Sequence, residues 1–374
     1  MRVVKFIDLQ AQRKRISVEI DEAIRRVLDA GSFIGGREVA ALETELAEFC
    51  GAAYCISCGN GTDALQLALM AAGVWRDDEV IVPTFNYIAT AEAVAMLGAR
   101  PVFVDVLRDT YNVDPRGVEA AITSHTKAIV PVSMFGQCPD FDELLAIGKR
   151  YGIVVIEDAA QSFGALYRGR PSGNIADVSC TSFYPSKPIA CYGDGGAVFT
   201  NDSALADRVR KIANHGQSRR YHHEVLGMNS RLDAVQAAIV RVKLTVFDDE
   251  IERRQQVAST YRNLLTEAGF VAPHVHPHNR SVFAQYTIEV DQRARVCEGL
   301  KAKDVPYAIH YPAPLHRQPA VRDDTVLAPV AERLTERVLS LPMHPYLSRN
   351  DCKTVVDALI GACKPDAVRR KVRA

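Results

Sequence analysis

The chain has 374 residues, 48% hydrophobic and 24% charged, a composition typical of a soluble globular protein with room for two domains. Lysine plus arginine and aspartate plus glutamate both number 45, so the formal net charge is zero, which argues against nucleic acid or an anionic membrane as the main partner. The nine cysteines and the absence of a secretory signal or a long apolar run indicate reduced thiols in the cytoplasm and no membrane helix.

The first part of the chain is predicted to alternate between strands and helices. Apolar residues at helical spacing predict helices over 13–30 and 39–49, which are separated by Gly31 and a Gly35-Gly36 turn. Repeated strand–helix units then predict an α/β fold with a mainly parallel sheet covered by helices on both faces. Ligands of such sheets bind at the carboxyl ends of the strands. The predicted strands are 54–58, 80–82, 101–106, 127–134 and 153–156, and the predicted helices are 62–72, 89–97 and 141–151.

The second part of the chain predicts a smaller α+β unit. Residues 231–268 are predicted to form one long, highly charged helix that links the two parts. The pattern then changes, which places the boundary between residues 245 and 270 and gives a large domain at 1–250 and a small one at 251–374. The elements predicted after the boundary are strands at 281–290 and 307–311 and helices at 296–303, 330–340 and 350–362.

The segment around Lys187 predicts a lysine held in a defined position. It follows a strand-like run at 178–183, lies between Pro185 and Pro188, and precedes a glycine-rich turn and a second strand-like run at 197–200. Proline restricts the local backbone, and a fixed amine suits Schiff-base chemistry with a carbonyl group. A surface lysine in a hairpin loop is the alternative.

The segment Gly59-Asn60-Gly61-Thr62-Asp63 ends a predicted strand and opens a predicted helix. Backbone N–H groups at a helix start lack internal partners and face a positive dipole end, so this position suits a phosphate. An ordinary helix cap by Thr62 is the alternative. The segment matches neither the Walker A loop nor the dinucleotide-binding glycine motif.

Two further segments lie at predicted strand ends. In Pro83-Thr84-Phe85-Asn86-Tyr87, either aromatic ring could stack on a flat cofactor or simply pack in the core. In Glu157-Asp158-Ala159-Ala160-Gln161, the aspartate suits a protonated pyridine nitrogen and the glutamine a second ring substituent. A helix cap by Asp158 is the alternative. Together, a phosphate site, an aromatic ring, a carboxylate and a lysine match the requirements of pyridoxal phosphate.

No metal site is predicted. Cys55 and Cys58 lie three apart on a predicted strand, so they face opposite ways and indicate buried small apolar side chains. The adjacent pair His222-His223 lacks the spacing of helix ligands and has no carboxylate cluster beside it, so a contact with sugar or solvent is the better interpretation.

Over nearly its whole length the sequence resembles the DegT/DnrJ/EryC1/StrS family of sugar aminotransferases, which are fold type I pyridoxal phosphate enzymes. The resemblance is carried by four motifs: Asn60-Gly61-Thr62-Asp63-Ala64-Leu65, Glu157-Asp158-Ala159-Ala160-Gln161, Ser182-Phe183-Tyr184-Pro185-Ser186-Lys187 and Gly193-Asp194-Gly195-Gly196. Some members have histidine in place of the lysine and catalyse dehydration, so Lys187 favours transamination.

The resemblance implies a role for each matching residue. Lys187 is expected to link covalently to the cofactor aldehyde and to move protons during the reaction, and Asp158 to pair with the pyridine nitrogen. Asn229 is expected to reach the phosphate of the neighbouring subunit's cofactor, so the active sites of a homodimer would be shared. The other cofactor-binding positions implied are Gly61, Thr62, Asp63, Tyr87 as the stacking ring, Gln161 at the ring hydroxyl, and Ser182.

A narrower resemblance points to the branch that acts on a UDP-linked 2-acetamido-2-deoxy-3-keto-hexuronic acid for surface polysaccharide, with L-glutamate as the usual amino donor. It rests on four segments: Lys187-Pro188, His215-Gly216-Gln217 with the basic stretch 219–223, Ile309-His310-Tyr311-Pro312 and Pro342-Met343-His344-Pro345. The substrate's negative charges require cationic groups, and the candidates are Arg231 and His310, with Tyr311 as a neighbour. The alternatives are another nucleotide-linked ketosugar, a dehydratase, or a nucleotide-sugar binding protein without catalysis.

Overall fold

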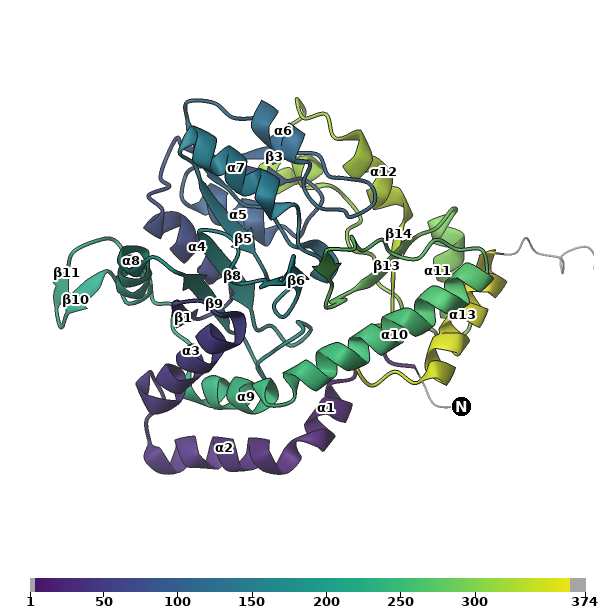
Figure 1. The fold of residues 1–374 in the computed structure, drawn as a ribbon, viewed down its shortest axis with the longest axis horizontal. Helices are drawn as coiled ribbons and strands as arrows, with labels where there is room; N and C mark the ends of the chain where they lie inside the picture. Colours follow the sequence, from purple (N-terminus) through teal and green to yellow (C-terminus); the bar gives the residue numbers. More distant parts are fainter. Residues whose placement is uncertain (1–3, 364–374) are drawn as a thin grey trace, which may run out of the picture.

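The computed structural model describes residues 4–363 and is built on a seven-stranded sheet (Figure 1). The strand order is β1-β9-β8-β5-β4-β2-β3. All neighbours from β8 to β3 are parallel, whereas β9 runs antiparallel to both β8 and β1. The mainly parallel α/β sheet predicted from the sequence is therefore confirmed. The strands are β1 (Tyr54–Cys58), β2 (Glu79–Pro83), β3 (Arg100–Val104), β4 (Thr126–Ile129), β5 (Val154–Asp158), β8 (Val178–Ser182) and β9 (Gly196–Thr200).

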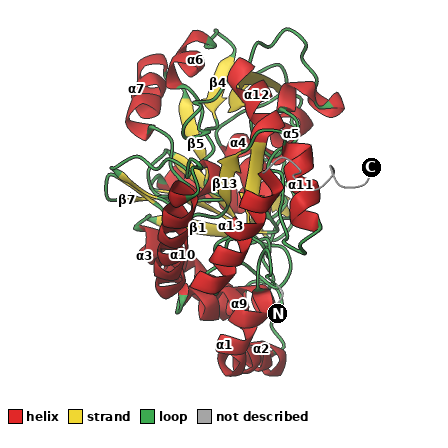
Figure 2. Cartoon of the chain, turned by 90° about the vertical axis from the view of Figure 1, so that its right-hand side faces the viewer, coloured by secondary structure: helices red, strands yellow, loops and turns green. Residues whose placement is uncertain are grey.

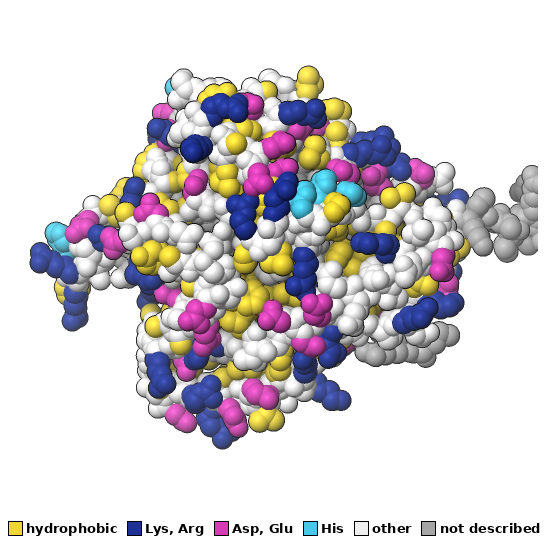
Figure 3. All heavy atoms as spheres, in the orientation of Figure 1, with side chains coloured by type: hydrophobic (Ala, Val, Ile, Leu, Met, Phe, Trp, Pro, Cys, Tyr) yellow, Lys and Arg dark blue, Asp and Glu magenta, His cyan; other side chains and the backbone are white. Residues whose placement is uncertain are grey.

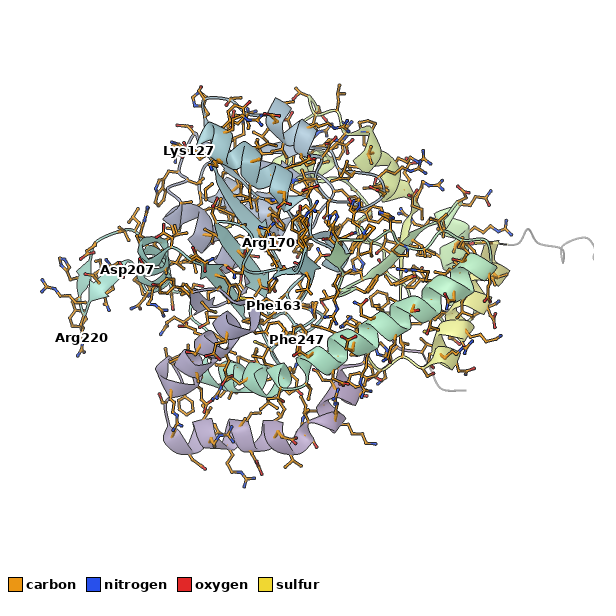
Figure 4. All side chains as sticks on the ribbon, in the orientation of Figure 1. Lys127, Phe163, Arg170, Asp207, Arg220 and Phe247 are labelled. Carbon is orange, nitrogen blue, oxygen red and sulfur yellow. The ribbon has the colours of Figure 1, made fainter. Side chains whose placement is uncertain are left out.

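Helices cover both faces of this sheet. One face packs against α4 (Gly61–Ala71), α5 (Ala89–Met96) and α8 (Ser203–Ala213), which share one apolar cluster with the strands. The other face packs against α3 (Gly36–Cys50), α6 (Pro115–Ala120), α7 (Phe141–Tyr151) and α9 (Ala234–Leu244). On that second face Phe163 and Phe247 stack at 6.2 Å between ring centroids (Figure 4).

The C-terminal part forms its own apolar cluster. It consists of β13 (Tyr286–Glu289) paired with β14 (Val338–Leu341) and of three helices, α10 (Phe247–Glu267), α11 (Arg293–Lys301) and α13 (Arg349–Cys363). Figure 2 shows these helices gathered around β13. The proposed domain boundary at residue 250 falls in the first turn of α10, which starts in the sheet-side cluster and continues into the C-terminal one. Residues 364–374 of the proposed small domain lie outside the described residues.

The remaining elements lie at the periphery. Helices α1 (Leu9–Arg15) and α2 (Ser17–Ala30) run along one edge of the molecule, and the hairpin of β10 (Gln217–Arg219) and β11 (His222–His223) projects away from it, with Arg220 at its turn (Figures 1 and 4). Three short strands, β6 (Leu166–Tyr167), β7 (Arg170–Pro171) and β12 (Asn279–Arg280), form a small separate sheet. Helix α12 (Pro329–Arg337) precedes β14 directly. Within residues 4–363, none of the helices has the length and apolar character required to cross a bilayer.

Two predicted helices are each divided in the structure. The predicted helix at 13–30 breaks at Ile16, whose buried side chain packs with Ile20 and Ile239. The predicted helix at 231–268 breaks at Thr245, whose hydroxyl donates to the Val242 carbonyl at 2.7 Å. Such local bonds offer the backbone an alternative to continued helix.

Three predicted strands are shorter than expected. In the run 127–134 the continuous strand ends at Ile129. Pro131 has no N–H to donate, and beyond it only a single bridge, between Val132 and Asp158, continues the pairing. The run 281–290 is a strand only in β13. The run 307–311 makes only a single bridge, between Ala308 and Ser340. Prolines 306 and 312 flank that run. Helices α6 and α8 and the short strands β6, β7, β10, β11 and β12 were not predicted. The predicted helix 330–340 is wrong over its last residues, which belong to strand β14.

Candidate active site

The lysine loop begins at the carboxyl end of β8. The N–H of Lys187 donates to the Tyr184 carbonyl at 2.9 Å, which closes a turn. The Cys191 N–H donates to the Phe183 carbonyl at 2.7 Å. The Lys187 side chain is half-buried. Burial lowers its pKa, while the negative charge of Asp158 opposes that shift. Lys187 therefore has a less basic amine than an exposed lysine and a carboxylate within electrostatic range, unlike the solvated hairpin lysine of the alternative interpretation.

Asp158 is the last residue of β5 and is buried. Its Oδ2 accepts a hydrogen bond from the Thr90 hydroxyl at 2.9 Å, and its Oδ1 accepts one from the Ala160 N–H at 3.1 Å. The Asn86 amide in turn donates to the Thr90 hydroxyl at 2.7 Å. Burial raises the pKa of Asp158, and the two hydrogen bonds and Lys187 act against that rise. Asp158 opens a turn and caps no helix, so the capping alternative is wrong.

Thr90 and Asn86 were not singled out as site residues from the sequence. Asn86 belongs to the 83–87 segment, in which a contact with a ligand was predicted only for the two aromatic residues. Of these two, Phe85 is fully buried and packs edge-on to Phe135, as core packing requires. Tyr87 is 59% exposed. Phe85 therefore belongs to the core, and Tyr87 remains available for a ligand.

Gln161 and Tyr311 link the sheet to the C-terminal part. Gln161 accepts a hydrogen bond from the Phe135 N–H at 3.0 Å and donates to the Tyr311 hydroxyl at 3.3 Å. The Tyr311 ring lies 6.3 Å from that of Tyr87. Burial, with the charge of Asp158 as a smaller cause, raises the pKa of Tyr311. The hydroxyl therefore stays protonated at neutral pH.

His310 lies within electrostatic range of Lys187. Burial and the positive charge of Lys187 lower the pKa of His310 to about 4. Its Nδ1 is 2.8 Å from the hydroxyl of Ser340 in β14, a contact that was not predicted. His310 is therefore neutral at physiological pH and offers hydrogen bonding to a substrate, rather than the full positive charge considered from the sequence.

The glycine-containing segment forms a tight turn into α4. Asn60 caps this helix, because its side chain accepts from the Asp63 N–H at 2.9 Å; the alternative of a cap by Thr62 is wrong. A Cβ atom on Gly61 would lie 2.6 Å from the Cβ of Ser182, and one on Gly196 would lie 2.5 Å from the Asn60 carbonyl oxygen. The start of α4 therefore lies directly against the end of β8, with no room for added side chains.

The polar residues around this turn form a second network. The Ser230 hydroxyl donates to Asp63 at 2.7 Å and accepts from the Gly59 N–H at 3.0 Å. Asn229 and Arg231 flank Ser230 and are both exposed, with Arg231 Nε donating to Asn229 Oδ1 at 2.7 Å. The Asp63 carboxylate is thus hydrogen-bonded within its own chain, while the side chains of Asn229 and Arg231 are exposed beside the turn.

Glu157, next to Asp158, is a site-supporting residue that was not predicted. Its fully buried carboxylate accepts four hydrogen bonds, all of 3.0 Å or less. Burial raises its pKa, and these bonds oppose the rise. Because the donors come from β8 and from two loops, Glu157 fixes the end of β5 on which Asp158 lies. The donors are the Ser133, Ser172 and Ser179 hydroxyls and the Gly173 N–H.

These residues fit pyridoxal phosphate. A carboxylate has room for about four hydrogen bonds, and Asp158 accepts two from the protein, which leaves capacity for the N–H of a pyridinium ring. Lys187 supplies an amine within electrostatic range of Asp158. The turn at Gly61 brings the start of α4, whose first backbone N–H groups have no partner within the helix, against the Ser182 side chain, and such a helix start suits a phosphate.

Comparison with known proteins agrees with this geometry. Residues 14–360 match the model of the DegT/DnrJ/EryC1/StrS aminotransferase family. The chain is 56% identical over 357 residues to the UDP-2-acetamido-2-deoxy-3-oxo-D-glucuronate aminotransferase of Pseudomonas aeruginosa, covering 96% of this chain and 99% of that protein.

Two solved structures share the fold. The S. venezuelae protein DesV, determined in complex with a ketimine intermediate, is 39% identical with a TM-score of 0.94, covering 98% of this chain and 100% of that one. NtdA from Bacillus subtilis, determined with the bound cofactor PMP, is 28% identical with a TM-score of 0.88, covering 96% of this chain and 83% of that one. The chain therefore belongs to the DegT/DnrJ/EryC1/StrS family and is a fold type I, pyridoxal phosphate-dependent sugar aminotransferase.

Proposed function

We propose that the enzyme transfers an amino group from L-glutamate to the C3 ketone of a UDP-linked 2-acetamido-2-deoxy-3-keto-hexuronic acid. The observation that carries this proposal is the 56% identity, over 96% of the chain, to an enzyme named for that substrate. The product, a 2,3-diamino uronic acid, would serve surface polysaccharide such as the O-antigen of lipopolysaccharide. We place the reaction in the cytoplasm, with no nucleic acid or membrane partner.

In this proposal Lys187 carries the protons. Pyridoxal phosphate, when bound, supplies an electron sink that stabilises negative charge on the carbon losing its proton. The Lys187 amine takes that proton from the donor's α-carbon and later returns one to the sugar carbon, acting as general base and then general acid. The lowered pKa of Lys187 favours this role, because only a neutral amine accepts a proton.

The surrounding residues orient the reactants. Asp158 holds the pyridine nitrogen in its protonated state, and Gln161 lies at the ring hydroxyl. Tyr87 provides the stacking ring. The carboxylate of Asp158 is suited to its part because it is buried and supported by two hydrogen bonds.

The phosphate is held by the turn at the start of α4, from Gly61 to Asp63, together with the hydroxyls of Thr62 and Ser182. We further propose that the enzyme is a homodimer in which Asn229 reaches the phosphate bound by the other subunit. The exposure of Asn229 beside this turn supports a contact made across an interface.

Substrate binding is assigned to Arg231, His310 and Tyr311. Arg231 is the cation for the sugar's carboxylate, because a guanidinium binds a carboxylate bidentately. The neutral His310 and the protonated Tyr311 hydroxyl supply hydrogen bonds near Lys187. Losing a charge-assisted bond costs about 1.5–3 kcal/mol, so Arg231→Ala should lower kcat/KM for the uronic acid by roughly ten- to a hundredfold.

The test compares two UDP-3-ketosugars that differ only in a carboxylate or a hydroxymethyl group, with wild type, Arg231→Ala and the control Arg116→Ala. Arg116 is 86% exposed and pairs with Asp114. Only Arg231→Ala should lower turnover, and only with the carboxylate sugar. Equal losses for both sugars would remove Arg231 as the carboxylate reader and make His310 the next candidate. Wild-type preference for the neutral sugar, or no turnover of either sugar, would favour another nucleotide-linked ketosugar as substrate.

A further inference from the structure

A group of imidazole and carboxylate side chains lies outside the active site. Asp109, His274 and His276 each offer one ligand atom, and these atoms all lie within 4.8 Å of one another. Among the described residues this is the one such group of three or more metal-ligating side chains. We propose that it binds a divalent first-row transition metal ion, of which Zn²⁺ is the most suitable.

The ligand types select the metal. Two imidazoles and one carboxylate are a set that Zn²⁺ accepts in three-ligand sites, with water in the fourth position. Mg²⁺ and Ca²⁺ prefer all-oxygen sites. In a tetrahedral site with bonds of about 2.1 Å, ligand atoms lie about 3.4 Å apart. His274 Nε2 and Asp109 Oδ2 are 4.0 Å apart, so the side chains would have to rotate to close the site, and both are about half exposed and so have solvent on one side to rotate into.

The backbone that carries the histidines is held in place. One buried side chain, Gln137, donates to the His274 carbonyl at 2.9 Å and accepts from the His276 N–H at 2.8 Å. The His276 ring lies edge-on to His274 at 4.9 Å and stacks on His278 at 5.2 Å. Figure 3 shows histidine side chains gathered on one face of the molecule, beside lysine and arginine. Because the backbone is held, the entropy cost of metal binding falls mainly on the rotation of the ligand side chains.

The site also has an opening for a fourth ligand. Asp109 and His274 line a surface cavity of about 380 Å³. Glu289 lines the same cavity, but its carboxylate pairs with Arg337 at 2.9 Å. Asp109 lies in the loop between β3 and α6, and the histidines lie in the segment between α10 and β12. A bound ion would therefore fasten a loop of the sheet to the segment that follows the long helix α10.

The experiment titrates the pyridoxal phosphate-loaded enzyme with Zn²⁺ against a chromogenic chelator. All proteins carry Cys363→Ser, because Cys363 is the exposed cysteine among the described residues. The test variants are Asp109→Asn and the double change His274→Asn, His276→Asn. The matched control is His222→Asn, His223→Asn, which removes two exposed histidines elsewhere. Visible absorbance of the bound cofactor verifies that each variant is folded.

We expect the parent to bind one Zn²⁺ per chain and the double variant to bind none. Asp109→Asn should bind Zn²⁺ at least about tenfold more weakly, because replacing even an outer-shell partner of a ligand costs roughly 10–100-fold. The control should match the parent, and Zn²⁺ should raise the melting temperature of both but not of the double variant. Equal Zn²⁺ affinity and stoichiometry in the parent and the double variant would overturn the proposal. Mg²⁺ binding as tight as Zn²⁺ binding would also overturn it.

Discussion

Replacing Thr90 with valine should slow the half-reaction with the amino donor, although Thr90 is not one of the residues assigned to bind the cofactor. The Thr90 hydroxyl donates to Asp158 at 2.9 Å and accepts from Asn86 at 2.7 Å, and all three residues are buried. A hydrogen bond to a charged group is worth about 1.5–3 kcal/mol. Losing it raises the pKa of Asp158 further, because the bond stabilises the ionised form.

If this loss is fully expressed in the barrier, the half-reaction with the amino donor slows by roughly ten- to a hundredfold. Asn86 also loses its acceptor in a buried position, which should reduce the free energy of unfolding by about 1–3 kcal/mol. Single-turnover absorbance measurements give the rate, and urea denaturation gives the stability.

Thr90→Ser is the matched control, because it keeps the hydroxyl and removes only a methyl group. It should retain most of the half-reaction rate. If Thr90→Val reacts as fast as wild type while its stability falls, the bond to Asp158 serves the fold alone and the electrostatic reasoning is wrong.

Three further predictions follow from the same site and from a buried histidine. Lys187→Ala should fold and still bind cofactor, but lose the visible absorbance of the lysine-linked form and all turnover; near-native activity would disprove its role. Mixing inactive Lys187→Ala with inactive Asn229→Ala should partly restore activity, since one site of each hybrid dimer carries neither change; no recovery despite proven subunit exchange would place Asn229 outside the partner's site. Burial lowers the pKa of His344 from 6.5 to about 4, so the unfolded chain binds more protons between these values and stability falls as pH drops through that window. His344→Asn, which keeps an acceptor for the Tyr346 N–H, should reduce the loss between pH 7 and pH 5 by about 2 kcal/mol; urea denaturation showing the same loss in both proteins would refute this.

The parallel sheet and its helices were predictable because their signals are local. Strand β1 and helix α7 have the predicted bounds, since an apolar run and an amphipathic pattern each end at a glycine or a polar cap. The predicted strand 127–134 is longer than β4 because its apolar character continues past Pro131, where the pairing with β5 is reduced to a single bridge between Val132 and Asp158. Strand β14 was not predicted because its four buried residues directly follow α12, with no glycine or proline between them to indicate a turn.

In the candidate site, too, the residues in local motifs were predictable and those brought in by long-range contacts were not. Lys187, Asp158 and Gln161 lie in motifs that the sequence displays as continuous segments. Thr90 could not be assigned from the sequence, because it lies in the first turn of α5 and contacts Asp158 across 68 positions. The pairing of Asp109 with His274 depends on a similar long-range contact. Such contacts depend on how elements pack, which local patterns do not encode.

The closeness of α4 to the end of β8 also limits how this enzyme can diversify. Any side chain at Gly61 or Gly196 would collide with Ser182 or with the Asn60 carbonyl. In a saturation mutagenesis library both positions should therefore return almost only glycine. Arg231, whose side chain extends outward, carries no such steric restriction. If the proposed roles hold, new sugar specificities would arise at exposed positions such as Arg231, while the turn proposed to hold the phosphate would remain closed to variation.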